Sequence, residues 1–409
     1  MIASYERLAS TSRSALQTVS MGDTEQTIVR IESSIKHIGQ VSWDACANPS
    51  GCSYNPFISY DFLHALEASG SAVAETGWLA QHLVLEDHNG DIAAICPCYL
   101  KNHSHGEYVF DHGWADAFYR AGGEYYPKLQ TSVPFTPATG RRLLVKPGPA
   151  QAEQEKLLAG AAIELTKRIG ASSHHLTFLT KGEWQHLGKL GFLQRTDQQY
   201  HWKNKGYDDF DQFLETLNSR KRKMIRKERA QAKSSGITID WISGNDICEH
   251  HWDTFYRFYI DTGNRKWGQP YLTREFYSRI GETMKDQILL VLCQHGNETI
   301  AGALNFIGSD TLYGRHWGAV EHHPFLHFEA CYYQAIEFAI EHKLSAVEAG
   351  AQGPHKIARG YEPTLTYSAH YIAEPSLRRA VADYLDHEMD YVNLEMKELA
   401  KLVPFRKQD

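Results

Sequence analysis

The sequence predicts an α+β protein built from two tandem domains of one kind, each a mixed sheet flanked by helices. Three observations support this fold class. The chain has 409 residues, more than one ordinary domain contains. Hydrophobic residues make up 42% and charged residues 22% of it, a composition typical of globular proteins. Three successive strand-like runs, with helix-like segments before and after them, occur once in each half.

The first half begins with a helix-like segment and a meander of three strands. Asn89-Gly90 is a turn signal between the first two strands. The third strand is rich in aromatic and polar residues. A helix with one apolar stripe and a further strand follow. In chain order, these elements are predicted over residues 59–69, 82–87, 92–100, 107–114, 153–168 and 176–180.

The second half repeats this order of elements. They are predicted over residues 273–284, 288–293, 299–307, 311–317, 327–343 and 346–349. The repeat length of roughly 200 residues is too long for a solenoid and suits duplication of one domain. A final helix over 377–402 carries an apolar stripe that indicates core packing, with a dimer seam as the alternative.

The domain boundaries follow from this repeat. We expect a first domain over 27–200 and a second over 201–409. The second domain opens with a helix pair over 208–233, in which Ser219 is the expected N-cap of a basic helix over 219–233. Residues 1–26 are polar and rich in Ser and Thr, so we expect a disordered N-terminal tail, with Met1 or Met21 as the start.

The cellular compartment is predicted from what the chain lacks. It has no run of about 18 apolar residues and no apolar signal core near its N-terminus. Its 7 cysteines are irregularly spaced, which disfavours a disulfide framework and a zinc site. None of the 22 histidines has a Cys or carboxylate partner at a metal-binding spacing, so we expect no metal. These features predict a cytoplasmic protein.

Positive charge is concentrated in one segment. The chain has a net charge of −7, yet residues 219–233 hold eight Lys or Arg and one Glu, a net charge of +7 that leaves −14 on the remainder. Such a segment indicates a localised anionic partner, such as the phosphates of a nucleic acid, with a solvated helix face as the alternative. The candidate phosphate-binding residues are Arg220, Arg222, Lys223, Arg226 and Lys227.

Candidate catalytic carboxylates occur at predicted strand and helix ends. Glu348 closes a predicted buried strand, where burial would raise its pKa and make it a base near neutral pH. A buried salt bridge to Lys356 or Arg359 is the alternative. Glu329 opens a predicted helix and is a second candidate, although capping of that helix is the favoured role. Asp111 ends a predicted strand of the first half, where a turn role is the alternative.

Candidate substrate-binding residues surround these carboxylates in the sequence. Four cations could capture a carboxylate or phosphate, with solvated surface charge as the alternative: Lys356, Arg359, Arg315 and Lys266. The other candidates for contact with a substrate are His112, Trp317, Gln352 and Tyr361. Three glycines nearby would let the backbone adopt positive φ or approach a ligand: Gly350, Gly353 and Gly360.

A family resemblance rests on these same residues. The order Trp317, His327-Phe-Glu329, Glu348-Ala-Gly350-Ala-Gln352-Gly353, Lys356 and Arg359-Gly360-Tyr361 resembles the FemAB-like branch of the GNAT acyltransferase superfamily, associated with peptidoglycan biosynthesis or recognition. Residues 110–114 and 263–268 resemble the same branch, so that the resemblance spans roughly 35–375. It implies two tandem GNAT-like (acyl-CoA N-acyltransferase) domains. Characterised Fem enzymes transfer an amino acid from aminoacyl-tRNA to the peptide amine of a cell-wall precursor.

The acyl donor is suggested by one loop. GNAT enzymes that use acetyl-CoA hold its pyrophosphate in a Gly-rich loop at a helix N-terminus. The matching loop here, over 319–327, has no glycine and carries Glu321, and the matching first-half region, 147–149, is Pro-rich. This disfavours a standard CoA site and favours an aminoacyl-tRNA donor of Fem type. The helix pair over 208–233 is, however, shorter than the helical hairpin of many Fem enzymes.

Three functional hypotheses remain open at this point. The first is a Fem-like N-acyltransferase or aminoacyltransferase that acts on an amine in a cleft between its domains. The second is a CoA-dependent GNAT enzyme with an atypical donor loop, and the third is a ligand-recognition module without catalysis. None requires a tightly bound cofactor. The partners expected are a small-molecule or peptide amine acceptor, tRNA, and the membrane surface if the acceptor is lipid-linked.

Overall fold

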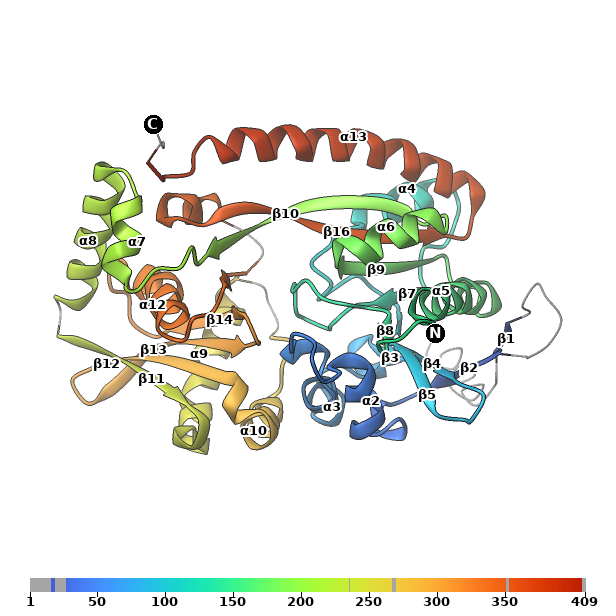
Figure 1. The fold of residues 1–409 in the computed structure, drawn as a ribbon, viewed down its shortest axis with the longest axis horizontal. Helices are drawn as coiled ribbons and strands as arrows, with labels where there is room; N and C mark the ends of the chain where they lie inside the picture. The colour runs from blue at the N-terminus through green and yellow to red at the C-terminus, as the bar shows by residue number, and fades with distance from the viewer. Residues whose placement is uncertain (1–15, 19–26, 235, 267–269, 351–352, 407–409) are drawn as a thin grey trace. The chain divides into compact units, whose positions relative to one another are not determined.

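The computed structural model describes residues 16–18, 27–234, 236–266, 270–350 and 353–406 (Figure 1). Contacts divide the chain into two compact units. Unit 1 comprises Met1–Cys52, Phe57–Asp197 and Thr366–Tyr391. Unit 2 comprises Ser53–Pro56, Gln198–Leu365 and Val392–Asp409. Within the described parts of the chain, no helix is both long enough and apolar enough to cross a membrane.

The division differs in three places from the domains expected from the sequence, one of which is the assignment of Ser53–Pro56 to unit 2. It falls after Asp197 instead of after residue 200, and it assigns Thr366–Tyr391 to unit 1, although the sequence placed all of 201–409 in one domain. The returning segment belongs to unit 1 because its strand pairs there, Tyr367 lying opposite Leu179. Of the expected tail, Leu16–Thr18 forms strand β1 and the other residues before Thr27 lie outside the described chain.

Unit 1 contains two sets of paired strands. The first set is antiparallel throughout, in the order β1-β2-β4-β5-β8, and the second has the order β16-β9-β7-β6-β3, in which β7 and β9 are parallel. The bounds of its elements are β1 Leu16–Thr18, β2 Thr27–Glu32, α2 Gln40–Ala47, α3 Tyr60–Ala68, β3 Leu79–Ala80, β4 His82–Glu86, β5 Ile92–Cys96, β6 Tyr99–Lys101, α4 His112–Arg120, β7 Lys128–Thr131, β8 Leu144–Val145, α5 Gln151–Arg168, β9 Ser173–Leu179 and α6 Lys181–Lys189.

Three elements have residues in both units: β10 Leu193–Lys203, β16 Glu362–Ile372 and α13 Pro375–Ala400. In unit 1, apolar residues of α5, such as Leu158 and Leu165, share a buried cluster with Leu83 of β4 and Ala94 of β5. The apolar stripe predicted for the final helix is a core stripe, because residues of α13 such as Val381 are buried in a cluster of this unit.

Unit 2 is built on a sheet with the strand order β11-β12-β13-β14-β15-β10. Its pairs are antiparallel except for β14 and β15, which are parallel. The bounds of its elements are α7 Phe210–Thr216, α8 Ser219–Lys233, β11 Ile237–Ser243, α9 Glu249–Lys266, α10 Arg274–Thr283, β12 Ile288–His295, β13 Glu298–Ile307, β14 Thr311–Ala319, α11 Leu326–Phe328, a π-helical turn Glu329–Tyr333, α12 Gln334–Glu341, β15 Ala346–Glu348 and a 3₁₀ segment Pro354–Arg359.

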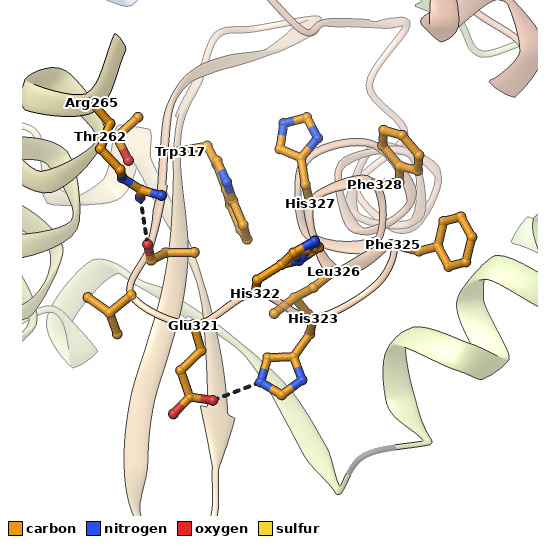
Figure 2. Close-up of a pocket in the computed structure, with 12 residues that line it drawn as sticks. Thr262, Arg265, Trp317, Glu321, His322, His323, Phe325, Leu326, His327 and Phe328 are labelled. Atoms are coloured by element: carbon orange, nitrogen blue, oxygen red, sulfur yellow. Dashed lines mark hydrogen bonds and ion pairs between the residues drawn. The ribbon is translucent and has the colours of Figure 1, made fainter.

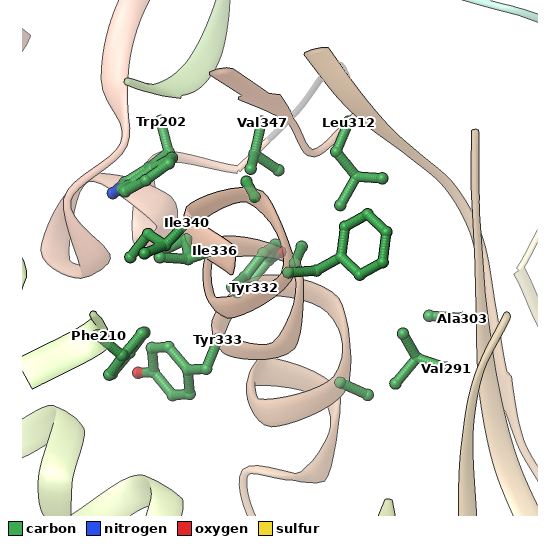
Figure 3. Packing of buried hydrophobic residues seen from close by; sticks show 14 of the residues in the cluster. Trp202, Phe210, Val291, Ala303, Leu312, Tyr332, Tyr333, Ile336, Ile340 and Val347 are labelled. Atoms are coloured by element: carbon green, nitrogen blue, oxygen red, sulfur yellow. The ribbon is translucent and has the colours of Figure 1, made fainter. Parts of the chain in front are cut away.

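The core of unit 2 forms around the π-helical turn and α12 (Figure 3). Ile336 and Ile340 of α12 belong to one buried cluster with Val291 of β12 and Leu312 of β14. Trp202 of β10 completes the cluster and is fully buried. This helix follows β14 and precedes β15 in the chain, so its packing fixes the position of the end of β14 and of the start of β15.

Most of the predicted elements are confirmed. In unit 2 the order α10, β12, β13, β14, helix and β15 is the predicted order of helix, meander, helix and strand. The helix predicted over 327–343 contains the π-helical turn, which the apolar stripe did not indicate. The basic helix α8 spans the predicted residues, but its N-cap is Asn218 instead of Ser219, because the side chain of Asn218 accepts a hydrogen bond from the backbone N–H of Lys221.

The third strand predicted for the first half is wrong. Residues 107–114 form no strand, and a helix begins within them at His112. The aromatic residues of this segment, with polar residues between them, suggested the third strand of the meander. In the structure Phe110 is 57% exposed, whereas Glu107 and Asp111 are buried against Lys128. The strand predicted over 92–100 is also divided at Pro97, into β5 of one sheet and β6 of the other.

Candidate functional site

The central feature of unit 2 is a fork between two parallel strands. β14 pairs with β15 only where Thr311–Tyr313 lies beside Ala346–Glu348. β15 ends at Glu348, whereas β14 continues to Ala319. On the other side of β15, Glu348 lies directly opposite His201 of β10. The fork therefore places the last side chain of β15 at the point where the two strands stop pairing.

Glu348 is a buried acid with few compensating partners. It is 7% exposed. Its carboxylate oxygens lie 3.7 Å from Nη2 of Arg315 and 3.8 Å from Nε2 of His201. Burial raises the pKa of Glu348 to about 7, because the nearby Arg315 guanidinium offsets only part of the desolvation. The sequence predicted a raised pKa or a salt bridge to Lys356 or Arg359; the ion-pair partner that the structure supplies is Arg315.

Two further buried groups, His201 opposite Glu348 and Lys356 near Arg315, have shifted pKa values. Burial, together with the charges of Arg315, Lys203 and Lys356, lowers the pKa of His201 to about 4, so its imidazole is neutral at neutral pH. Burial and Arg315 lower the pKa of Lys356 to about 8. The Lys356 ammonium donates a hydrogen bond to the carbonyl oxygen of Gly350 at 2.9 Å. Lys356 and Arg315 thus give the fork two buried cations.

Arg359 is held in a buried ion pair. Its Nη2 donates hydrogen bonds to both carboxylate oxygens of Glu228 on α8, at 2.8 and 2.9 Å. The guanidinium also lies 3.5 Å from the centre of the Phe328 ring. Tyr333 donates a further hydrogen bond to Glu228. These contacts tie the 3₁₀ segment Pro354–Arg359 to α8, and they were not apparent from the sequence because Glu228 is remote in the chain.

Glu329 forms a second buried ion pair, so the predicted capping role is wrong. Its side chain is fully buried and accepts hydrogen bonds from Arg229 on α8 at 3.0–3.2 Å. Gln334 donates another at 2.8 Å. The residue begins the π-helical turn inside the helix, and the helix itself starts after Phe325, so Glu329 lies beyond the N-cap position. The carboxylate fixes α8 to this helix.

A pocket of about 480 Å³ opens beside the loop that follows β14 (Figure 2). Trp317 of β14 and His327 of α11 form part of its wall, with their ring centres 5.4 Å apart. Arg265 of α9 lies at the rim and donates a hydrogen bond to the carbonyl oxygen of Ala319 at 2.9 Å. The lining residues are Thr262, Arg265, Trp317, Ala319, Val320, Glu321, His322, His323, Phe325, Leu326, His327 and Phe328. This is the loop whose sequence disfavours a CoA pyrophosphate.

The helix α8 has one buried face and one exposed face that carries basic side chains. Ile225, Glu228 and Ala232 are buried on one face. On the other, Arg226 pairs with Asp211 at 3.0 Å. The candidate phosphate-binding residues Arg220, Lys223, Arg226 and Lys227 are exposed, whereas Arg222 is half-buried. The helix is therefore fixed by its buried carboxylate and presents cations to solvent.

Asp111 lies in a buried polar cluster of unit 1. It accepts hydrogen bonds from Lys128 and from the hydroxyl of Tyr125, the latter at 2.8 Å. Although burial opposes it, the charges of Lys128 and His175 hold the pKa of Asp111 well below its usual range. Lys128 also bonds Glu107 at 2.6 Å. A carboxylate held in this way is a poor proton acceptor at neutral pH.

The remaining predicted residues have different surroundings. His112 is the first residue of α4 and is exposed. Tyr361 is fully buried, with its ring centre 5.6 Å from that of Tyr332, and belongs to the core cluster of unit 2. Gln352 and the side chain of Lys266 lie outside the described part of the chain. The three glycines predicted to take positive φ, namely Gly350, Gly353 and Gly360, all do so.

Some of the residues predicted for the site lie at the fork, and others lie elsewhere in unit 2. Arg315 connects Glu348 and Lys356 electrostatically, because its charge shifts the pKa of both. Arg359 and Glu329 instead bind carboxylate and guanidinium partners on α8. His201 was missed by the sequence analysis, since only the pairing of β10 with β15 brings it to Glu348.

A comparison with protein-family models places the chain in a family. Residues 34–407 match the FemAB-like family, described as peptidoglycan biosynthesis/recognition. No curated protein sequence matches the chain.

Solved structures also resemble the chain. FemX is 13% identical, with a TM-score of 0.49, over 77% of this chain and 93% of that one. The C-terminal domain of a putative lysylphosphatidylglycerol synthetase from Agrobacterium fabrum is 8% identical, with a TM-score of 0.50, over 87% and 97%. A tandem GNAT protein from the clavulanic acid biosynthesis pathway is 12% identical, with a TM-score of 0.44, over 85% and 98%. The predicted fold class, two tandem GNAT-like domains with mixed sheets flanked by helices, is confirmed.

Proposed function

Because the chain belongs to the FemAB-like family, we propose that it is an aminoacyltransferase whose unit 2 transfers an aminoacyl group to the amine of a peptidoglycan-related acceptor. The observation that carries this proposal is Glu348, a buried acid with a pKa of about 7 at the fork between β14 and β15. A carboxyl group with that pKa can both accept and return a proton at neutral pH.

Acyl transfer to an amine requires a proton acceptor and an aligned ester. We assign Glu348 as the base that takes a proton from the acceptor ammonium. The freed amine nitrogen attacks the carbonyl carbon of the donor ester, a C–N bond forms, and the C–O bond to the leaving hydroxyl breaks. Glu348 releases that first proton to solvent, takes the second proton from the attacking nitrogen as the C–N bond forms, and delivers it to the leaving oxygen, so that the products are an amide, the free hydroxyl and one proton in solvent. His201 stays neutral beside it, because its pKa is about 4, and so adds no competing charge.

The cations of the fork suit an anionic substrate. Arg315 is buried beside Glu348, Lys356 is buried within electrostatic reach of Arg315, and each can bind a carboxylate or phosphate group. Cell-wall precursors carry carboxylates and phosphates, which supports such an acceptor, either free or lipid-linked. The pocket beside β14 is the proposed place for the acyl end of the donor, with Trp317 and His327 as its aromatic wall.

Aminoacyl-tRNA is the donor we propose. The loop Ala319–His327 that borders the pocket lacks glycine, so it does not offer the Gly-rich loop that holds a CoA pyrophosphate at a helix N-terminus. The exposed cations of α8, including Lys223 and Lys227, can neutralise phosphates of a nucleic acid. A cytoplasmic location accords with this donor.

The proposal is tested by supplying donors and acceptors separately. The protein is incubated with tRNA charged with radiolabelled amino acids, or with labelled acetyl-CoA, and with free or lipid-linked peptidoglycan precursors. Labelled precursor formed from charged tRNA, and absent with Glu348→Gln, is the expected result. Product from acetyl-CoA alone would identify a CoA-dependent enzyme instead. Precursor binding without product from either donor would identify a recognition module.

A further inference from the structure

Three potential metal ligands meet at the edge of the pocket in unit 2. His295 ends β12, and Glu321 and His323 lie in the loop after β14. One ligand atom of each residue lies within 4.8 Å of the corresponding atoms of the other two. Nε2 of His323 is 2.7 Å, and Nδ1 of His295 is 3.5 Å, from the same oxygen of Glu321. Figure 2 shows Glu321 and His323 turned toward one another below the pocket.

The backbone that carries these side chains is held in place on both sides. His295 pairs with Glu298 at the end of the β12–β13 hairpin. The loop begins with the backbone N–H of Val320 donating to the carbonyl oxygen of Ile300 at 2.9 Å. The backbone N–H of Leu326 donates to the carbonyl oxygen of His323 at 3.3 Å. Hairpin and loop are therefore joined by the sheet, and the three side chains meet without a change of fold.

The donor set suits a transition metal of borderline softness. Two imidazoles and one carboxylate are ligands of Zn²⁺, Co²⁺ and Ni²⁺, whereas Mg²⁺ and Ca²⁺ favour oxygen alone. With bonds of about 2.0–2.2 Å, tetrahedral ligands lie roughly 3.3 Å apart, close to the spacings between Glu321 and the two imidazoles.

Access for an ion and for water is also present. The side chains of His295 and Glu321 are 45% and 41% exposed, so an ion can enter and keep open coordination positions. The sequence disfavoured a metal because no histidine has a carboxylate partner at a characteristic spacing. The fold supplies that partner, since the pairing of β12, β13 and β14 brings His295 beside Glu321.

We propose that His295, Glu321 and His323 bind one divalent transition-metal ion of the Zn²⁺ class at the rim of the pocket. The ion neutralises the carboxylate of Glu321 and places positive charge beside Trp317 and His327, the aromatic wall of the same pocket. The site rests on the ligand geometry alone and is independent of the proposed transferase activity.

The test is calorimetry of Zn²⁺ binding to the full-length, untagged protein after removal of metal with a chelator. We expect one bound Zn²⁺ per chain. The double variant His295→Ala/His323→Ala should bind at least about 100-fold more weakly and Glu321→Gln about 10-fold more weakly. The matched control is His322→Ala, a change in the same loop outside the group, and it should retain the wild-type affinity.

A second readout separates this site from adventitious binding. Co²⁺ added to the metal-free protein should give a visible absorption spectrum typical of tetrahedral ligation, and the double variant should lack it. Circular dichroism confirms that each variant is folded. The proposal is overturned if the wild-type chain binds no Zn²⁺, or if the double variant and His322→Ala bind Zn²⁺ equally well. Neither result bears on transfer from a charged donor.

Discussion

Glu348 at the end of β15 lies 3.7 Å from the guanidinium of Arg315 on β14, in a site so buried that this one cation does not restore the usual acidity of the carboxyl group. Ion pairs elsewhere in unit 2 have shorter contacts and more donors; Glu228, for example, accepts two hydrogen bonds from Arg359. In unit 2, Glu348 is thus poorly compensated while Glu228 and Glu329 are closely paired with arginines, a pattern typical of functional sites.

The burial of Glu348 predicts that the unfolding free energy depends on pH. The pKa of Glu348 is raised from 4.5 to about 7 on folding, so the folded protein binds the proton more tightly than the unfolded chain. The unfolding free energy therefore falls as pH rises from about 4.5 to 7, by an amount on the order of 3 kcal/mol from this group. Urea unfolding of wild type and Glu348→Gln at several pH values measures it. Parallel pH curves for the two proteins would contradict the assigned pKa shift.

Arg359 is expected to stabilise the fold. Arg359→Ala leaves the buried carboxylate of Glu228 without its main partner, which should lower the unfolding free energy by about 3–5 kcal/mol. The double variant Arg359→Ala/Glu228→Gln removes that charge and should recover part of the loss. Thermal unfolding followed by circular dichroism measures both. An unchanged melting temperature with loss of substrate binding would instead assign Arg359 to the substrate.

Asp111 is predicted to act in the same structural way in unit 1. Asp111→Ala removes a carboxylate that Lys128 and Tyr125 both contact, leaving a fully buried ammonium with Glu107 as its charged partner. The expected loss is again about 3–5 kcal/mol of unfolding free energy. Exposed His112 provides the matched control, since His112→Ala should leave stability nearly unchanged. If Asp111→Ala melted like wild type but lost activity, Asp111 would have a catalytic role.

The exposed cations of α8 are predicted to bind the donor through phosphates. Lys223→Ala/Lys227→Ala should reduce the slope of log K against log salt concentration for tRNA binding by about two, one for each lost phosphate contact. Filter binding at several salt concentrations measures the slope. The control Lys167→Ala/Lys189→Ala changes two exposed lysines of unit 1 and should leave it unaltered. Equal slopes for all three proteins would exclude α8 from the donor site.

The sequence predicted much of the fold because apolar runs, turn signals and charged stretches indicate individual helices and strands. The meander of unit 2 and the buried strand before Gly350 were visible as apolar runs and turn signals, and the basic helix over 219–233 was visible from its charged residues and the break before it. The raised pKa of Glu348 was also predictable from the sequence. A carboxyl group at the end of a buried strand is desolvated, and desolvation raises its pKa.

What the sequence could not supply were partners brought together by the fold. His201 reaches Glu348 only through the pairing of β10 with β15, and Glu228 lies 131 residues from Arg359. The failure at 107–114 has a related cause, because the buried partner that Glu107 and Asp111 share, Lys128 of β7, is distant in the sequence. Here the charged side chains are buried and the aromatic Phe110 is exposed. Nothing in the sequence of this segment indicates that arrangement.

The proposed aminoacyl transfer depends most directly on Glu348 as the proton acceptor. The decisive measurement is kcat/KM for transfer from aminoacyl-tRNA to the precursor amine as a function of pH, for wild type and Glu348→Gln. For wild type, the rate should rise with pH through about 7 as Glu348 ionises, and the variant should be slower by about 10²–10⁴-fold and lack that rise. A folded Glu348→Gln variant with the wild-type rate and pH profile would contradict the central claim.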